Sequence, residues 1–219
     1  MAKDDFNFKD GRYYTELAAA FVRGKIGGMD DLSPEELFAL GKARGLRLHK
    51  FKHQTELPRV RKVLGVLQGI APTSILDIGS GRGTFLWPLL NSFPQILVIA
   101  TDREWTRIVE IDAVRRGGRE NLISLQIDAG AISLADDCVE VVTALEVIEH
   151  LAQPQRAAAE AVRIARKFVI ASVPSKEDNN PEHIQLFNRD SFEALWMRAG
   201  AHGVNIQYVL NHIIAVVKV

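Results

Sequence analysis

Apolar positions gather in short blocks along residues 71 to 219, and five of these blocks have the length of a strand. They cover residues 75–78, 96–100, 122–127, 139–144 and 168–173. The block Ile96-Leu97-Val98-Ile99-Ala100 contains no polar residue, which is typical of a strand buried on both faces of a parallel sheet. The pattern therefore predicts an α/β fold built on a mostly parallel sheet.

The chain ends in two more strand-like blocks, residues 204–210 and 213–219, with only Asn211 and His212 between them. Parallel neighbours need a crossover of roughly a dozen residues or more, so a two-residue link forces these strands to pair antiparallel. We expect a seven-stranded sheet that is closed by this C-terminal hairpin.

Residues 1–70 carry their apolar positions at helical rather than strand spacing. Ser33-Pro34-Glu35-Glu36 combines an N-cap, a proline in the first turn and a capping-box glutamate, and predicts a helix that ends near Gly45. Residues 55–69 repeat this arrangement, with Pro58 near the start and an aliphatic stripe on one face. We expect two parts: a helical N-terminal extension over residues 1–70 that covers the active site, and a main domain over residues 71–219.

Composition narrows the classes of function. Lys+Arg and Asp+Glu both number 27, so the net charge is zero and no overall field draws the protein to nucleic acid or to a membrane. No apolar stretch reaches the length of a membrane span, and the first residues lack the apolar core of a signal peptide, so we expect a cytoplasmic protein. Cys138 is the single cysteine, and we expect it to be a buried packing residue rather than a nucleophile.

The segment Ile75-Leu76-Asp77-Ile78-Gly79-Ser80-Gly81-Arg82-Gly83 joins a strand to a helix through a glycine-rich turn. Glycine accepts positive φ and lets a ligand approach the backbone, and the N–H groups at the start of a helix face the same ligand. The dinucleotide fingerprint G-x-G-x-x-G would require glycine where Thr84 stands, and the carboxylate of Asp77 would repel a diphosphate. The turn therefore favours a cationic nucleotide-type cofactor over NAD.

The pattern D-x-G-x-G-x-G, formed by Asp77, Gly79, Gly81 and Gly83, resembles the first motif of class I S-adenosylmethionine-dependent methyltransferases. The resemblance covers about residues 71–219 and implies a Rossmann-like, doubly wound fold that binds S-adenosylmethionine. In that family the glycine turn lies against the methionine part of the cofactor, and the carboxylate helps to hold the cofactor's amino group.

Acidic residues after the next two strands agree with this resemblance. Asp102 stands where an acid accepts hydrogen bonds from both ribose hydroxyls of a nucleoside, whether the nucleoside belongs to NAD or to S-adenosylmethionine. Asp128 stands where the family places an acid at the adenine amino group, and an Asx turn that starts a loop is the alternative. The cofactor-binding residues expected from the resemblance are Asp77, Gly79, Gly81, Gly83, Asp102, Arg103, Asp128, Ala129 and Glu146.

The segment Leu145-Glu146-Val147-Ile148-Glu149-His150-Leu151 resembles the substrate-facing part of methyltransferases that act on small molecules and, in one branch, on RNA ends. If it is helical, Glu146, Glu149 and His150 share one face, and with His183 they resemble the metal site of small-RNA 2′-O-methyltransferases. Relatives with a similar pattern act on small molecules, and the helix dipole alone favours acids near a helix start, so we expect no metal. Glu149, His150 and His183 are also candidates for a general base, and no residue is assigned as catalytic.

A basic stretch spans residues 42–62. It could receive an anionic substrate or RNA phosphates, but a solvated helix face is the commoner outcome and the one that we expect. Its members are Lys42, Arg44, Arg47, His49, Lys50, Lys52, His53, Arg59, Arg61 and Lys62.

The sequence thus predicts an S-adenosylmethionine-dependent methyltransferase that acts on a small-molecule acceptor at oxygen, nitrogen or carbon. Three alternatives stay open: a metal-dependent RNA-end 2′-O-methyltransferase, an NAD-binding oxidoreductase, and a non-catalytic partner protein that binds S-adenosylmethionine. A nucleic-acid partner is not favoured, and no membrane partner is expected. The apolar stripes of the N-terminal helices must be buried, and we expect them to pack against the open substrate edge of the sheet and to wall the acceptor pocket.

Overall fold

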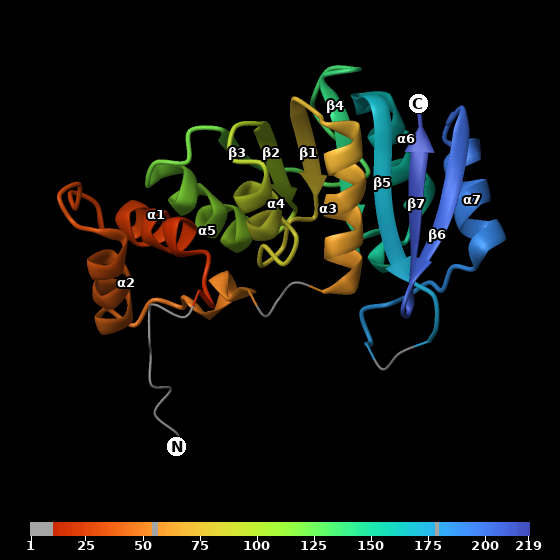
Figure 1. The fold of residues 1–219 in the computed structure, drawn as a ribbon. Helices are drawn as coiled ribbons and strands as arrows, with labels where there is room; N and C mark the ends of the chain where they lie inside the picture. The colour runs from red at the N-terminus through yellow and green to blue at the C-terminus, as the bar shows by residue number, and fades with distance from the viewer. Residues whose placement is uncertain (1–10, 54–56, 178–179) are drawn as a thin grey trace.

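The computed structural model describes residues 11–53, 57–177 and 180–219. Its centre is one seven-stranded sheet with the order β3-β2-β1-β4-β5-β7-β6 (Figure 1). The strands are β1 (Ser74–Ile78), β2 (Leu97–Asp102), β3 (Leu122–Gln126), β4 (Val139–Leu145), β5 (Ala165–Pro174), β6 (Gly203–Val209) and β7 (His212–Lys218). The first five pair in parallel, and β7 runs antiparallel to both β5 and β6. The predicted mostly parallel sheet with a C-terminal hairpin is confirmed.

Helices cover both faces of this sheet. Successive residues of a strand point to opposite faces, so Ile75 of β1 belongs to one hydrophobic cluster and its neighbour Leu76 to the other. The first cluster contains buried residues of α1 (Thr15–Ile26), α2 (Pro34–Ala43), α3 (Pro58–Ile70), α4 (Leu86–Ser92) and α5 (Trp105–Arg116). The second contains buried residues of α6 (Pro154–Ile164) and α7 (Arg189–Arg198).

The N-terminal helices extend the first cluster away from the strands. We expected the two capped helices of this extension to pack against the substrate edge of the sheet. The expectation is wrong for α2, which packs against α1, while α1 in turn packs against α5 (Figure 1). The second capped helix, α3, contacts α4 and β6, and its residues Arg59 and Val60 line a cavity together with Asp77. Two glycines explain the close crossing of α1 and α5. A Cβ on Gly24 would lie 1.8 Å from the carbonyl oxygen of Ala113, and a Cβ on Gly117 would lie 1.7 Å from that of Ala20. Only glycine lets the two backbones approach this closely.

The capping residues and prolines in the sequence predicted where α2 and α3 begin. The hydroxyl of Ser33 accepts a hydrogen bond from the Glu36 N–H at 3.2 Å, and the Ser33 N–H donates to the Glu36 carboxylate at 2.8 Å, so the predicted capping box of α2 is confirmed. The helix predicted over residues 55–69 begins at Pro58, and residues 55 and 56 of that prediction lie outside the described residues. Among the residues that are described, no helix is long and apolar enough to cross a membrane.

The predicted burial of Cys138 is wrong, because this residue is exposed. It stands in the turn just before β4 begins at Val139, and the preceding Asp137 has a φ of 54°. Partial burial still raises the pKa of the thiol, so the Cys138 side chain stays protonated near neutral pH and is a poor nucleophile.

Candidate active site at the carboxyl ends of the parallel strands

The three glycines of the turn between β1 and α4 have two roles: two are required by packing within the protein, and one leaves its backbone open to a ligand. All three have positive φ: 67° at Gly79, 56° at Gly81 and 85° at Gly83. A Cβ on Gly83 would lie 2.0 Å from the indole of Trp87, and one on Gly79 would lie 2.6 Å from Val147, so both are needed for packing within the protein. A Cβ on Gly81 would come no closer than 3.7 Å to its nearest neighbour. The backbone at Gly81 is therefore the part of the turn that a ligand can approach.

Asp77 lies at the end of β1 and is buried. One carboxylate oxygen accepts a hydrogen bond from the Ser80 hydroxyl at 2.6 Å, and the other accepts one from the Thr143 hydroxyl at 2.7 Å. Burial raises the pKa of Asp77 from 3.8 to about 6, against the lowering effect of the two hydroxyl donors, and the nearby Asp102 adds to the increase. A cation placed beside this carboxylate would offset its desolvation.

Asp102 ends β2 and ties that strand to the glycine turn. Its Oδ2 accepts a hydrogen bond from the Gly81 N–H at 2.9 Å, and its Oδ1 accepts one from the Glu104 N–H at 2.8 Å. A carboxylate oxygen can accept more than one hydrogen bond, so this geometry leaves Asp102 able to accept from ligand hydroxyls as well. A hydrogen bond thus joins Asp102, the residue expected to bind the ribose, to the glycine turn that is expected to contact the methionine part of the cofactor.

The expected residues surround a cleft of about 580 Å³, which we call the acidic cleft. It is lined by Gly79, Gly81, Asp102, Arg103, Asp128, Ala129 and Glu146, among others. A smaller cavity of about 170 Å³ is lined by Asp77 and shares Gly79, Gly81 and Glu146 with the cleft. Gly83 lines neither cavity, because its Cβ position is filled by Trp87. The structure therefore brings together all the expected cofactor residues except Gly83, and their role in binding stays a prediction.

The two readings of Asp128 are both compatible with its position. Its Oδ1 accepts a hydrogen bond from the Gly130 N–H at 2.7 Å, and its carbonyl accepts one from the Ala131 N–H at 3.0 Å, which is an Asx turn. The side chain also lines the acidic cleft. Asp128 thus starts the loop after β3 and also stands at the wall of the cleft.

Glu146 follows β4 directly in the left-handed region, with a φ of 58°. Such a conformation is uncommon outside glycine and is often found at functional sites. The carboxylate accepts a hydrogen bond from the Ser172 hydroxyl at 3.1 Å, lies 3.2 Å from the His212 ring and lies 3.9 Å from the Arg59 guanidinium. Neither Arg59 nor His212 was predicted at this site, and α3 and β7 bring them there.

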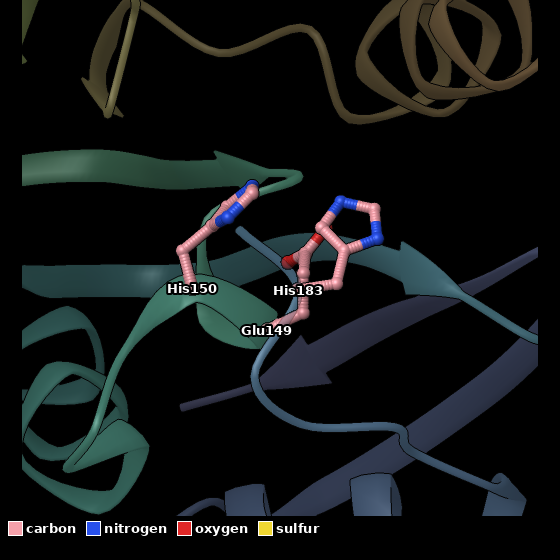
Figure 2. Close-up of side chains that lie close together, drawn as sticks. All are labelled: Glu149, His150 and His183. Carbon is pink, nitrogen blue, oxygen red and sulfur yellow. The ribbon is translucent and has the colours of Figure 1, made fainter. Parts of the chain in front are cut away.

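The predicted quartet of metal-ligating side chains is not assembled. The segment after β4 is a short 3₁₀ turn over Ile148–His150, not an α-helix, and Glu146 is held by β5 and β7 instead. The remaining three, Glu149, His150 and His183, do converge, with their donor atoms all within 4.8 Å of one another (Figure 2). The condition for Glu146, Glu149 and His150 to share one helical face is therefore not met, and the structure brings Glu149, His150 and His183 together without Glu146.

The loop that carries His183 is fixed to this turn. The carbonyl of Glu149 accepts hydrogen bonds from the N–H groups of Ile184 and Gln185, and the His150 Nδ1 lies 2.8 Å from the carbonyl of Glu182. The Glu149 side chain is buried, and the two imidazole rings have their centroids 4.8 Å apart. Figure 2 shows the Glu149 carboxylate beside both rings. One carboxylate and two imidazoles can hold a divalent ion or move protons.

Comparison with known proteins agrees with this fold. Residues 76–170 match a family model described as a methyltransferase domain. An O-methyltransferase family protein from Burkholderia thailandensis has a similar structure, with 16% identity and a TM-score of 0.60 over 74% of this chain, which spans 55% of that protein. The methyltransferase domain of the bacterial protein CtHen1-C aligns with 19% identity and a TM-score of 0.62 over 74% of this chain and 97% of its own.

A third structure, an S-adenosylmethionine-dependent methyltransferase from Aquifex aeolicus, aligns with 16% identity and a TM-score of 0.57 over 73% of this chain and 96% of its own. No curated protein matches the sequence. At these identities the likenesses show a shared fold. The chemistry must be argued from the side chains of this chain.

Proposed function

We propose, on the premise that residues 76–170 form a methyltransferase domain with the class I fold, that this protein transfers a methyl group from S-adenosylmethionine to a small-molecule acceptor. The observation that carries the proposal is the acidic cleft. It lies at the carboxyl ends of parallel strands, where ligands bind in open α/β sheets, and its acids outnumber its bases. The acids are Asp102, Glu104, Asp128, Glu146 and Glu182, and the basic residues are Arg103, Arg107 and His150.

The cleft and the smaller cavity suit the two ends of one extended ligand. They share Gly79, Gly81 and Glu146, so a single molecule can pass from one to the other. We place the nucleoside in the cleft, with its ribose at Asp102. We place the amino-acid end in the smaller cavity, where Asp77 would face the ammonium group and Arg59 would face the carboxylate.

The protein's part in the reaction is mainly positioning. S-adenosylmethionine supplies a methyl group on a sulfonium, and the acceptor atom forms a bond to that carbon while the C–S bond breaks and its electron pair returns to sulfur. Alignment of the two reactants can supply up to ~7 to 11 kcal/mol of the acceleration. A hydroxyl acceptor must also lose a proton, and the imidazoles of His150 and His183 are the candidates to take it.

A specific observation favours the RNA-end alternative as a second candidate. Glu149, His150 and His183 offer one carboxylate oxygen and two imidazole nitrogens, a donor set that suits a first-row divalent ion such as Mn²⁺. Glu146, the fourth residue of the predicted quartet, is instead hydrogen-bonded by Ser172 and lies beside His212. Our expectation stays that methyl transfer does not depend on a metal.

Transfer of labelled methyl groups from S-adenosylmethionine to an extract of the source cells tests the proposal. The extract is fractionated by size, with and without nuclease treatment. We expect label in a small, nuclease-resistant fraction from the cytoplasm. Label in a fraction that nuclease degrades would favour the RNA-end alternative. Binding of the cofactor with no labelled product would favour a non-catalytic partner protein.

A further inference from the structure

A second large cavity lies on the other side of the glycine turn from the acidic cleft. It has a volume of about 630 Å³, and we call it the basic pocket. Its walls come from the N-terminal segment after α2, from the glycine turn and from α5. Phe21 of α1 and Trp87 of α4 add an apolar surface. A concave site of this size, with aromatic walls and a few charged groups, is typical of a small-molecule site.

Four cationic side chains line this pocket and one anionic side chain opposes them. The cations are Arg47, Lys50, Arg82 and Arg107, and the anion is Glu110. Glu110 is already shared, because it pairs with Lys50 and, at 3.0 Å, with Lys25. Within the described residues, the guanidinium groups of Arg47, Arg82 and Arg107 pair with no carboxylate. The pocket therefore carries an excess of positive charge in a protein whose net charge is zero.

Lys50 is an enclosed cation of this pocket, whereas Arg47 and Arg82 are exposed to solvent. Its ammonium lies 3.8 Å from the centre of the Phe21 ring, and its side chain is only 11% exposed. Burial lowers the pKa of Lys50, the ion pair with Glu110 opposes that effect, and the positive charges of Lys25 and Arg107 lower the pKa further. Cations that lie close to one another are stabilised when an anion binds among them.

The basic stretch predicted from sequence divides into three groups. Lys42, Arg44, Arg61 and Lys62 are exposed and line none of the three cavities, as the solvated-face interpretation expects. Arg47, His49 and Lys50 line the basic pocket, although Arg47 and His49 are also exposed, and Arg59 lines the small cavity beside Glu146. Lys52 and His53 line none of these cavities and lie against the rings of Tyr13 and Tyr14.

The two large cavities have opposite charge and meet at Gly81 and Arg107. If the acidic cleft holds the cationic cofactor, as the proposed function requires, a ligand in the basic pocket is of the opposite sign. We propose that the basic pocket binds the anionic group of the acceptor, and that the acceptor is a small molecule carrying a phosphate. Arginine side chains match the geometry of phosphate oxygens, and a protein without net positive charge has no long-range attraction for nucleic acid.

Calorimetric titration of the full-length protein with inorganic pyrophosphate, at fixed low ionic strength, tests this proposal. Thr106 lines the basic pocket only and stands in the first turn of α5, where the helix dipole favours an acid. Thr106→Glu places a negative charge in the pocket without threatening the fold, and Thr106→Gln is its neutral match. Arg47→Gln removes one cation of the pocket, and Arg61→Gln removes an exposed arginine that lines none of the cavities.

We expect Thr106→Glu and Arg47→Gln each to weaken pyrophosphate binding by about tenfold or more, and the two control variants to change it by less than about twofold. Absence of pyrophosphate binding to the wild type at millimolar concentration, or equal loss in test and control variants, would overturn the proposal. A short single-stranded RNA that displaces pyrophosphate and binds far more tightly would overturn its small-molecule part. S-adenosylmethionine is titrated in parallel: its failure to bind while pyrophosphate binds would refute the proposed function and not the anion site.

Discussion

Replacement of Asp77 by asparagine should stabilise the unliganded protein and should also weaken its binding of S-adenosylmethionine. Asparagine keeps the shape of the side chain, and its hydrogen bonds can be satisfied. The Thr143 hydroxyl, 2.7 Å from Oδ1, can still donate to the amide oxygen. The Ser80 hydroxyl lies 3.2 Å from the carbonyl of residue 77, so it can donate there and accept from the new amide N–H.

The magnitude follows from the pKa of Asp77, which burial raises from 3.8 to about 6. Between these two pH values the folded protein binds more protons than the unfolded chain, so its stability falls as the pH rises through this window and stays low above it. A difference of about 2 pKa units corresponds to about 3 kcal/mol, which is the desolvation cost of keeping the buried carboxylate ionised at neutral pH. Asp77→Asn removes this cost, so its advantage should be near zero at pH 4 and approach ~3 kcal/mol at pH 7.

Urea unfolding of both proteins between pH 4 and pH 8, without cofactor, measures this difference. Titration with S-adenosylmethionine over the same pH range measures how the affinity of each protein for the cofactor depends on pH. A cation binds the ionised carboxylate, so wild-type affinity should rise with pH up to about 6 and then level off, whereas the affinity of Asp77→Asn should be lower and lack this rise. A variant that is less stable than the wild type at pH 7, or that shows the same pH dependence of binding, would refute the reasoning.

The other predictions concern helix packing, the ribose site and the metal. Gly24→Ala should destabilise the fold by about 1 to 3 kcal/mol or more in urea unfolding, because the new Cβ would meet a backbone carbonyl of α5. The control Gly65→Ala in α3 has open space around it and should be neutral or stabilise the fold by about 0.5 to 1 kcal/mol. Equal effects of the two substitutions would contradict the close contact of α1 with α5. Asp102→Ala should lower S-adenosylmethionine affinity about tenfold to a hundredfold, and an analogue without ribose hydroxyls should bind both proteins alike; a variant that still prefers the true cofactor would show that another residue reads the ribose. Methyl transfer should persist in a chelator, and loss with rescue by Mn²⁺ that His183→Ala abolishes would instead support the RNA-end alternative.

The parts of the fold that could be predicted depend on local sequence. The apolar block at residues 96–100 predicted β2, of which residues 98–100 are buried and Leu97 is exposed, and the two-residue link before β7 permits only a hairpin. The packing place of the N-terminal helices could not be predicted. It depends on the close approach of Gly24 to Ala113 and of Gly117 to Ala20, and no local pattern marks which glycine meets which carbonyl.

The candidate site divides in the same way. The glycine turn and Asp102 are read from spacing along the chain, because the ends of neighbouring parallel strands lie at one edge. Arg59 and His212 reach Glu146 only through the placement of α3 and the pairing of β7 with β5, where His212 lies opposite Pro174. Glu146 and Glu149 do not share a helical face, because the positive φ of Glu146 turns the chain and only a short 3₁₀ turn follows.

Calorimetric titration of the full-length protein with S-adenosylmethionine, with its demethylated product S-adenosylhomocysteine and with NAD tests the central claim most directly. An acidic cleft beside Gly81, with Thr84 in place of a third fingerprint glycine, should bind the first two in the micromolar range and show no measurable heat with NAD. Gly81→Val should abolish binding of both cofactor forms, because its side chain would fill the open space beside the turn. Micromolar binding of NAD with none of S-adenosylmethionine would contradict the assignment of this cleft.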